Sequence, residues 1–235
     1  IGLWAATRRG SDRSAAAGGG RPVDERIAAG TESLKDGHFR LAAQEFEAAN
    51  AIANSRQTTQ LARQASLLAD VVEWSLADNP RRDFPLSQQA LRQLETILRK
   101  APTAGVQAER EWQAQFERRY QGQAIVFDND IHRDAGRYYL KQTLKVNSRQ
   151  ALIELGDLRL LHDLPNDWPR ELLLGARLAS CRLEPPGTYW VFRFQPDSGV
   201  LFTDQDALAA YAGAPPDERQ RRLLRQQAEW LGNAR

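Results

Sequence analysis

The chain has 235 residues, of which 42% are hydrophobic and 26% charged, and its formal net charge is +2. These values exclude a disordered or fibrous protein and allow two small domains. The near-neutral balance also argues against a globally basic, nucleic-acid-binding surface. Cys181 is the single cysteine, which excludes an intrachain disulfide and a cysteine-based zinc cluster.

Residues 1–23 predict the end of a membrane helix followed by a flexible linker. The apolar residues 1–6 are followed closely by Arg8 and Arg9, the order found where a membrane helix leaves the bilayer on its positive side. Residues 10–22 are mainly Gly, Ala, Ser and Arg, a composition suited to a tether. The absence of methionine, also at position 1, favours a fragment of a longer protein. We expect the body of the protein on the cytoplasmic side of a membrane, or in the cytoplasm if residues 1–6 belong to no membrane helix.

Residues 24–118 form a predicted helical domain. Apolar residues recur there at helical spacing, with breaks at residues 36–37, 78–80 and 101–102. Within it, residues 57–77 are predicted to form one long helix, and residues 86–98 carry the apolar stripe of another. The pattern as a whole predicts about four helices and a fifth that leads out of the domain.

The first helix pair, residues 23–56, combines small and aromatic residues in a particular order. Small residues allow two helices to approach closely, and aromatic residues fill the space between them. The residues assigned to this packing are Gly30, Gly37, Phe39, Ala42, Phe46 and Ala49. The pattern resembles one tetratricopeptide repeat, and the resemblance implies a scaffold that binds a protein partner. A regular array is not predicted, because Ala42 and Ala90 lie 48 residues apart, whereas the repeat period is about 34.

The polar face of the same helix pair is the predicted partner surface. Its residues are Glu32, Lys35, Arg40, Gln44 and Glu47. Because their charges are mixed in sign, they do not indicate which class of ligand would bind. The alternative is that the helical stripes form a plain bundle without a partner site.

Residues 119–203 are predicted to form a small antiparallel β-barrel domain. Apolar and polar residues alternate over residues 138–146, which predicts a strand with one buried face. Further strands are predicted at residues 124–127, 151–155, 172–183, 189–194 and 200–202, with a short helix at 157–164. This order fits an OB-like barrel, while an SH3-like barrel or an open antiparallel sheet explains it nearly as well.

An OB-like barrel raises nucleic-acid binding as the alternative function, because such barrels stack bases on exposed aromatic residues. The candidates are Tyr139, Tyr189, Trp190, Phe192 and Arg193. Trp190, Phe192 and Phe194 share one face at a spacing of two, however, which is typical of a buried strand. We therefore expect a core strand there and disfavour nucleic acid as a partner.

No catalytic, cofactor or metal motif is found in the sequence. Phosphate-binding and dinucleotide-binding glycine motifs and a His-Glu-x-x-His zinc motif are absent. Asp128 and Asp130 lie in the densest acidic cluster, which is interpreted as a strand-end turn rather than as a cation site. No catalytic residue, cofactor or metal is predicted, and an enzyme of unrecognised type is the third interpretation.

Residues 204–235 are predicted to form C-terminal helices. Thr203 is expected to cap a short helix, and a final helix follows residues 215–216, with apolar Leu223, Leu224 and Leu231 beside several arginines. Docking of this helix on the rest of the chain is favoured over a role in binding a partner or a membrane surface. The sequence as a whole predicts an α+β protein with a tetratricopeptide-like helical layer, a small barrel and C-terminal helices. Its predicted function is that of a non-enzymatic, membrane-tethered adaptor for an unidentified protein partner.

Overall fold

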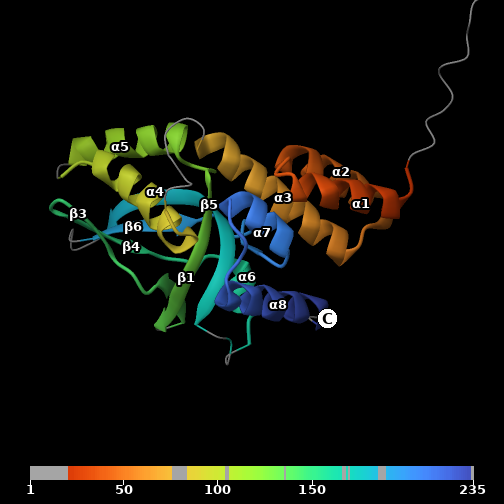
Figure 1. The fold of residues 1–235 in the computed structure, drawn as a ribbon. Coiled ribbons are helices and arrows are strands. Elements are labelled where there is room, and N and C mark those ends of the chain that lie inside the picture. Colours follow the sequence, from red (N-terminus) through yellow and green to blue (C-terminus); the bar gives the residue numbers. More distant parts are fainter. Residues whose placement is uncertain are drawn as a thin grey trace, which may run out of the picture.

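The computed structural model describes residues 21–75, 84–103, 106–134, 136–165, 168, 170–184 and 189–233. Five helices come first: α1 (Val23–Lys35), α2 (Phe39–Ala53), α3 (Arg56–Ser75), α4 (Leu86–Lys100) and α5 (Val106–Arg119). In Figure 1, α1, α2 and α3 lie at one end of the molecule, while α4 and α5 lie over the other end of the sheet. The predicted membrane-helix end and most of the linker, residues 1–20, lie outside the described residues. Among the described helices, none is both long and apolar enough to cross a bilayer.

Close packing of α1 against α2 depends on a glycine. A Cβ atom added to Gly30 would lie 2.6 Å from Cε1 of the fully buried Phe46, so a side chain there would force the helices apart. The turn between the helices uses Gly37 at φ +74°, a conformation that favours glycine. Acidic Asp24 and Glu25 in the first turn of α1 complement the positive end of its helix dipole.

The strands form one sheet rather than a barrel. They are β1 (Ala124–Asp134), β2 (Arg137–Leu140), β3 (Leu144–Val146), β4 (Arg149–Ile153), β5 (Glu171–Glu184), β6 (Tyr189–Phe194) and β7 (Val200–Leu201). Their order is β2-β1-β5-β6-β4-β3, with β7 paired to β5. All pairs are antiparallel except β4 with β6, which is parallel.

The predicted closed antiparallel barrel, OB-like or SH3-like, is therefore wrong: the sheet is mixed, has seven strands and does not close. The long strand β5 explains this arrangement, since residues 171–177 pair with β1 and residues 178–184 pair with β6. A bulge between Leu178 and Ser180 separates the two halves of β5. The predicted strand at 138–146 is two strands, β2 and β3, which belong to opposite ends of the sheet order. The predicted order of helices, strands and C-terminal helices is confirmed.

Three helices complete the fold: α6 (Arg159–His162), α7 (Gln205–Ala212) and α8 (Glu218–Asn233). The cap of α7 differs from the predicted one. The carboxylate of Asp204 accepts a 2.8 Å hydrogen bond from the amide of Ala207, whereas the hydroxyl of Thr203 accepts one from the side chain of Gln64 at 2.9 Å. Thr203 therefore links α3 to the chain before α7 instead of capping that helix.

Two apolar clusters lie on opposite faces of the β1–β5 ladder. One joins α4 and α5 to residues such as Ile125 and Phe127 of β1. The other joins α1, α2, α3, α7 and α8 to Ala124 and Val126 of the same strand. Alternate residues of β1 thus face different clusters. The predicted domain boundaries near residues 118 and 203 stay a prediction. Both clusters include buried residues from either side of residue 118, and the second also includes buried residues beyond 203.

Gly30 provides a test of the helix packing. Gly30→Ala is expected to destabilise the protein by about 1–2 kcal/mol, since overpacking of the fixed Phe46 ring outweighs the gain of about 1 kcal/mol in helix propensity. The measurement is the urea midpoint of unfolding. Gly232→Ala in α8 is the matched control, because a Cβ atom there meets nothing within 4 Å. A Gly30→Ala protein as stable as the control would contradict the packing.

Candidate functional site

The residues assigned to helix packing lie in the interior of the first helix pair, except at the turn. Gly30 is buried against Phe46, and Phe39, Ala42, Phe46 and Ala49 are buried along α2. Gly37 lies in the turn and packs against nothing, since a Cβ atom there would meet no atom within 4 Å. The role of Gly37 is therefore conformational, and the other five residues meet between the helices.

The five residues of the predicted partner surface have different surroundings in the structure. Glu32 and Gln44 are exposed on α1 and α2 respectively. Lys35 lies 3.7 Å from a carboxylate oxygen of Asp206 in α7, with both side chains exposed, so this ion pair contributes little. Glu47 lies at a small cavity that α2 shares with α3 and the turn before β7.

Arg40, the fifth residue of that predicted surface, is engaged within the fold. Its Nη2 lies 2.6 Å from a carboxylate oxygen of Glu73 and 2.9 Å from one of Asp70, both on α3. Hydrogen bonds to Glu73 and then to Asp70 raise the pKa of Arg40 above its ordinary value. Asp70 also pairs with Arg177 of β5. This chain of charges links α2 through α3 to the sheet, so Arg40 is not free to select a partner.

The outward face of α2 carries exposed apolar side chains that the sequence reasoning missed. Leu41 is 54% exposed and Ile52 is 59% exposed, and they are two of the three large hydrophobic residues that are exposed in the described chain. The half-buried Ala48 lies between them at helical spacing. We call Leu41, Ala48 and Ile52 the outer stripe of α2. A shallow cavity of about 210 Å³ borders Leu41 and is lined on its other side by Ala69 and Val72 of α3.

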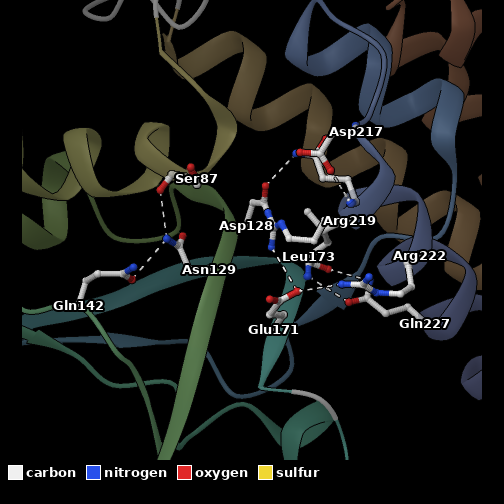
Figure 2. A network of polar contacts seen from close by, with 11 residues as sticks. Ser87, Asp128, Asn129, Gln142, Glu171, Leu173, Asp217, Arg219, Arg222 and Gln227 are labelled. Atoms are coloured by element: carbon white, nitrogen blue, oxygen red, sulfur yellow. Dashed lines mark hydrogen bonds and ion pairs between the residues drawn. The ribbon is translucent and has the colours of Figure 1, made fainter.

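A buried ion pair attaches α8 to the sheet (Figure 2). The side chain of Asp128 in β1 is only 2% exposed and pairs with Nη2 of Arg219. It also accepts a 2.8 Å hydrogen bond from Nε2 of Gln220. Glu171 of β5 lies 3.6 Å from Nη1 of Arg219 and 3.9 Å from Nη2 of Arg222. Partial burial works to lower the pKa of Arg219, but the carboxylates of Asp128, Glu171 and Asp217 together outweigh it and the pKa is raised.

A buried amide fixes the same helix further along. Gln227 of α8 donates through Nε2 to the carbonyl of Leu173 at 3.0 Å and accepts through Oε1 from the amide of Leu173 at 3.0 Å. It donates a further hydrogen bond to the carbonyl of Phe202. The Asp128–Arg219 ion pair and the hydrogen bonds of Gln227 lie near the same part of the sheet in Figure 2. The predicted docking of the final helix on the rest of the chain is confirmed, with Leu223 and Leu224 buried.

Beside this attachment, α3 and α8 border a cavity of about 450 Å³. We call it the α3–α8 groove. Its lining residues are Arg56, Gln57, Gln60, Leu61, Thr203, Ala228, Leu231 and Gly232. The residues come from three separate segments of the chain, so no local sequence pattern could have revealed the groove.

Two side chains that can take part in catalysis, Cys181 and Asp128, are buried in the fold. In the described part of the chain, no three His, Cys, Asp or Glu residues cluster as metal ligands would. Burial raises the pKa of the Cys181 thiol well above its ordinary value, which leaves the thiolate scarce at neutral pH, although a hydrogen bond with Trp112 works the other way. Asp128, a member of the acidic cluster, serves as the partner of Arg219.

The aromatic strand β6 is part of the core, as predicted. Trp190, Phe192 and Phe194 are buried, and Trp190 stacks edge-to-face with Trp112 of α5 at 6.2 Å. Arg193 pairs with Glu154 at 2.9 Å and with Glu184 at 2.7 Å. These side chains are therefore not available to stack on bases or to bind phosphates.

A scan against protein-family models and searches of curated proteins and of solved structures find no match to this chain. The assignment of a function rests on the chain's own geometry.

The Asp128–Arg219 pair gives a second prediction. Arg219→Met is expected to destabilise the protein by about 2–4 kcal/mol, because it leaves a buried carboxylate without a cation. Asp128→Asn keeps the bond to Gln220 and should cost about 1–2 kcal/mol. The double variant should cost about 1–3 kcal/mol less than the sum of the two, as measured by urea unfolding in a double-mutant cycle.

The control for this cycle is Arg159, whose ion pair with Asp197 at 3.1 Å is largely exposed. Arg159→Met should change stability by less than about 0.5 kcal/mol. Equal effects of Arg159→Met and Arg219→Met would refute a structural role for the buried pair.

Proposed function

We propose that the chain is a non-enzymatic adaptor that binds a protein partner on its tetratricopeptide-like helical layer, α1 to α3. The observation that carries the proposal is the outer stripe of α2, where two large apolar side chains face solvent. Leu41 and Ile52 are both more than half exposed, and their position eleven residues apart places them on one side of the helix. Apolar side chains repeated along one exposed face of a helix are typical anchors in the packing of one helix on another.

The packing of α7 supports the outward face of α2 as the partner surface. Helix α7 contacts both α1 and α3, and Ala207, Leu208 and Tyr211 of α7 join their apolar cluster. That side of the layer is therefore covered by the chain itself. The outer stripe of α2 is left for a partner, which we propose to be a helix that places apolar residues on Leu41 and Ile52.

A comparison of α2 variants tests the partner surface. The amount of specifically bound partner recovered with the doubly substituted Leu41→Asp, Ile52→Asp protein should be at least about tenfold lower than with the parent protein. The reason is that two charges replace the central apolar contacts. The measurement is quantitative mass spectrometry of proteins that copurify with the tagged chain from its native cells. Circular dichroism and a thermal melt establish that the variant is folded.

Tyr189→Asp is the matched control, since Tyr189 is the third exposed large hydrophobic residue of the described chain, at 42% exposed, and lies on β6. It should retain the partner. An unchanged set of copurifying proteins in the α2 variant, or equal loss in the control, would count against the proposal.

A membrane tether on the cytoplasmic side is part of the proposed function. Its support is the apolar run at residues 1–6 followed by Arg8 and Arg9. We expect the coding sequence upstream to add at least about 12 apolar residues, enough to complete a spanning helix. Determining that upstream sequence is the measurement, and a polar or charged stretch there would remove the tether from the proposal.

A further inference from the structure

We propose that the α3–α8 groove is a second binding site, which takes an acidic amphipathic helix of a partner protein. The inference does not depend on the outer stripe of α2, since the two surfaces share no residue. It rests on the apolar lining of the groove, on the charge of its rim and on the way α8 is attached.

The floor of the groove is apolar and firmly supported. Its apolar lining residues are the half-buried Leu61 and Leu231 and the exposed Ala228. Leu223 and Leu224, on the same helix, are buried. The volume of about 450 Å³ falls within the range of roughly 300–1,000 Å³ typical of ligand pockets. The groove can therefore receive the apolar side chains of one helix face.

The four arginines in the first half of α8 divide into two pairs by their positions. Arg219 and Arg222 face the sheet, where they pair with Asp128 and Glu171. Arg221 and Arg225 lie seven and three residues before Ala228, on the same side of the helix. Neither lines the groove itself, and Nη1 of Arg221 donates to the carbonyl of Pro216 at 3.0 Å. The sheet side is thus neutralised within the chain, whereas the groove side keeps its positive charge.

Arg56 adds a third cation to the rim from α3. It is exposed, and its Nη1 donates to the carbonyl of Leu231 at 3.5 Å. Across the described residues, Arg56, Arg221 and Arg225 have no carboxylate within ion-pair distance. Glu229 is the one acidic residue in the second half of α8, and it is exposed. The rim therefore carries a net positive charge beside an apolar floor.

Charge complementarity selects the occupant. A helix with acidic residues flanking an apolar stripe would place its carboxylates near the three arginines and its apolar face on Leu61, Ala228 and Leu231. The chain's own N-terminal segment is unsuited to this role. Its residues 1–20 carry Arg8, Arg9 and Arg13 against Asp12, the same sign of charge as the rim, so the occupant is expected to come from another protein.

Fluorescence anisotropy with the purified chain tests the inference. The probe is a fluorescein-labelled peptide of about 15 residues, with leucines at i, i+3, i+4 and i+7, glutamates at the positions that flank this stripe and alanines elsewhere. Its counterpart has lysine in place of every glutamate. The acidic peptide should bind at least about tenfold more tightly than the basic one, and its affinity should fall as salt is raised.

Variants then locate the binding site. Ala228→Glu should weaken binding of the acidic peptide about tenfold, and Arg225→Glu about three- to tenfold, because they place negative charge at the floor and the rim. Ala28→Glu is the matched control on an exposed alanine of α1, and Arg110→Glu is the matched control on an exposed arginine of α5. Both controls should stay within about twofold of the parent protein.

Three outcomes would overturn the proposal. The first is equal binding of the two peptides, and the second is binding that Ala228→Glu and Ala28→Glu weaken alike. The third is that the groove has another occupant. In that case no peptide binds, and Ala228→Glu abolishes either self-association of the chain or its binding to vesicles rich in anionic lipid. None of these results depends on the outer stripe of α2, so a failure here leaves the proposed adaptor function to its own test.

Discussion

Leu67 of α3 meets the sheet at Gly175 of β5, and the joining of helices and strands depends on this contact. A Cβ atom at Gly175 would lie 2.5 Å from Cδ2 of Leu67, so only glycine allows the helix to lie this close to the strand. One turn further along α3, Asp70 pairs with Arg177, two residues beyond Gly175 on the same side of β5. Arg40 joins α2 to α3 by its ion pairs with Asp70 and Glu73. The position of the helical layer on the sheet therefore depends on this short segment of β5.

The sequence predicted local structure well, because that structure follows from periodicity. The buried stripe of α2, with Phe46 against Gly30, and the core strand around Phe192 could be derived from spacing alone. Pairing between distant strands could not be derived in this way. The alternation of residues marks a strand, but it does not say that β4 would lie parallel to β6, or that β5 would divide its pairing between β1 and β6.

The candidate surfaces were harder to predict than the fold for a related reason. A polar residue on a helix can face solvent, a neighbouring helix or the sheet, and Arg40 and Gln44 behave differently although they are four residues apart. Leu41 and Ile52 lie outside the main apolar stripe, and this displacement is the only local signal that they are exposed. The α3–α8 groove depends on residues from distant segments, such as Leu61 and Ala228, which come together only after folding.

The strands at the two ends of the sheet order, β2 and β3, are edge strands, and edge strands invite association with other chains. At one end, β3 is only three residues long and presents the exposed Lys145. At the other end, β2 has four residues, begins with the exposed Arg137, and is joined through Tyr139 to Glu154 beyond β4. Shortness, a positive charge and one covering bridge all discourage the growth of a continuous intermolecular sheet. These features leave the helices, rather than the strand edges, as the surfaces on which the proposed partners would bind.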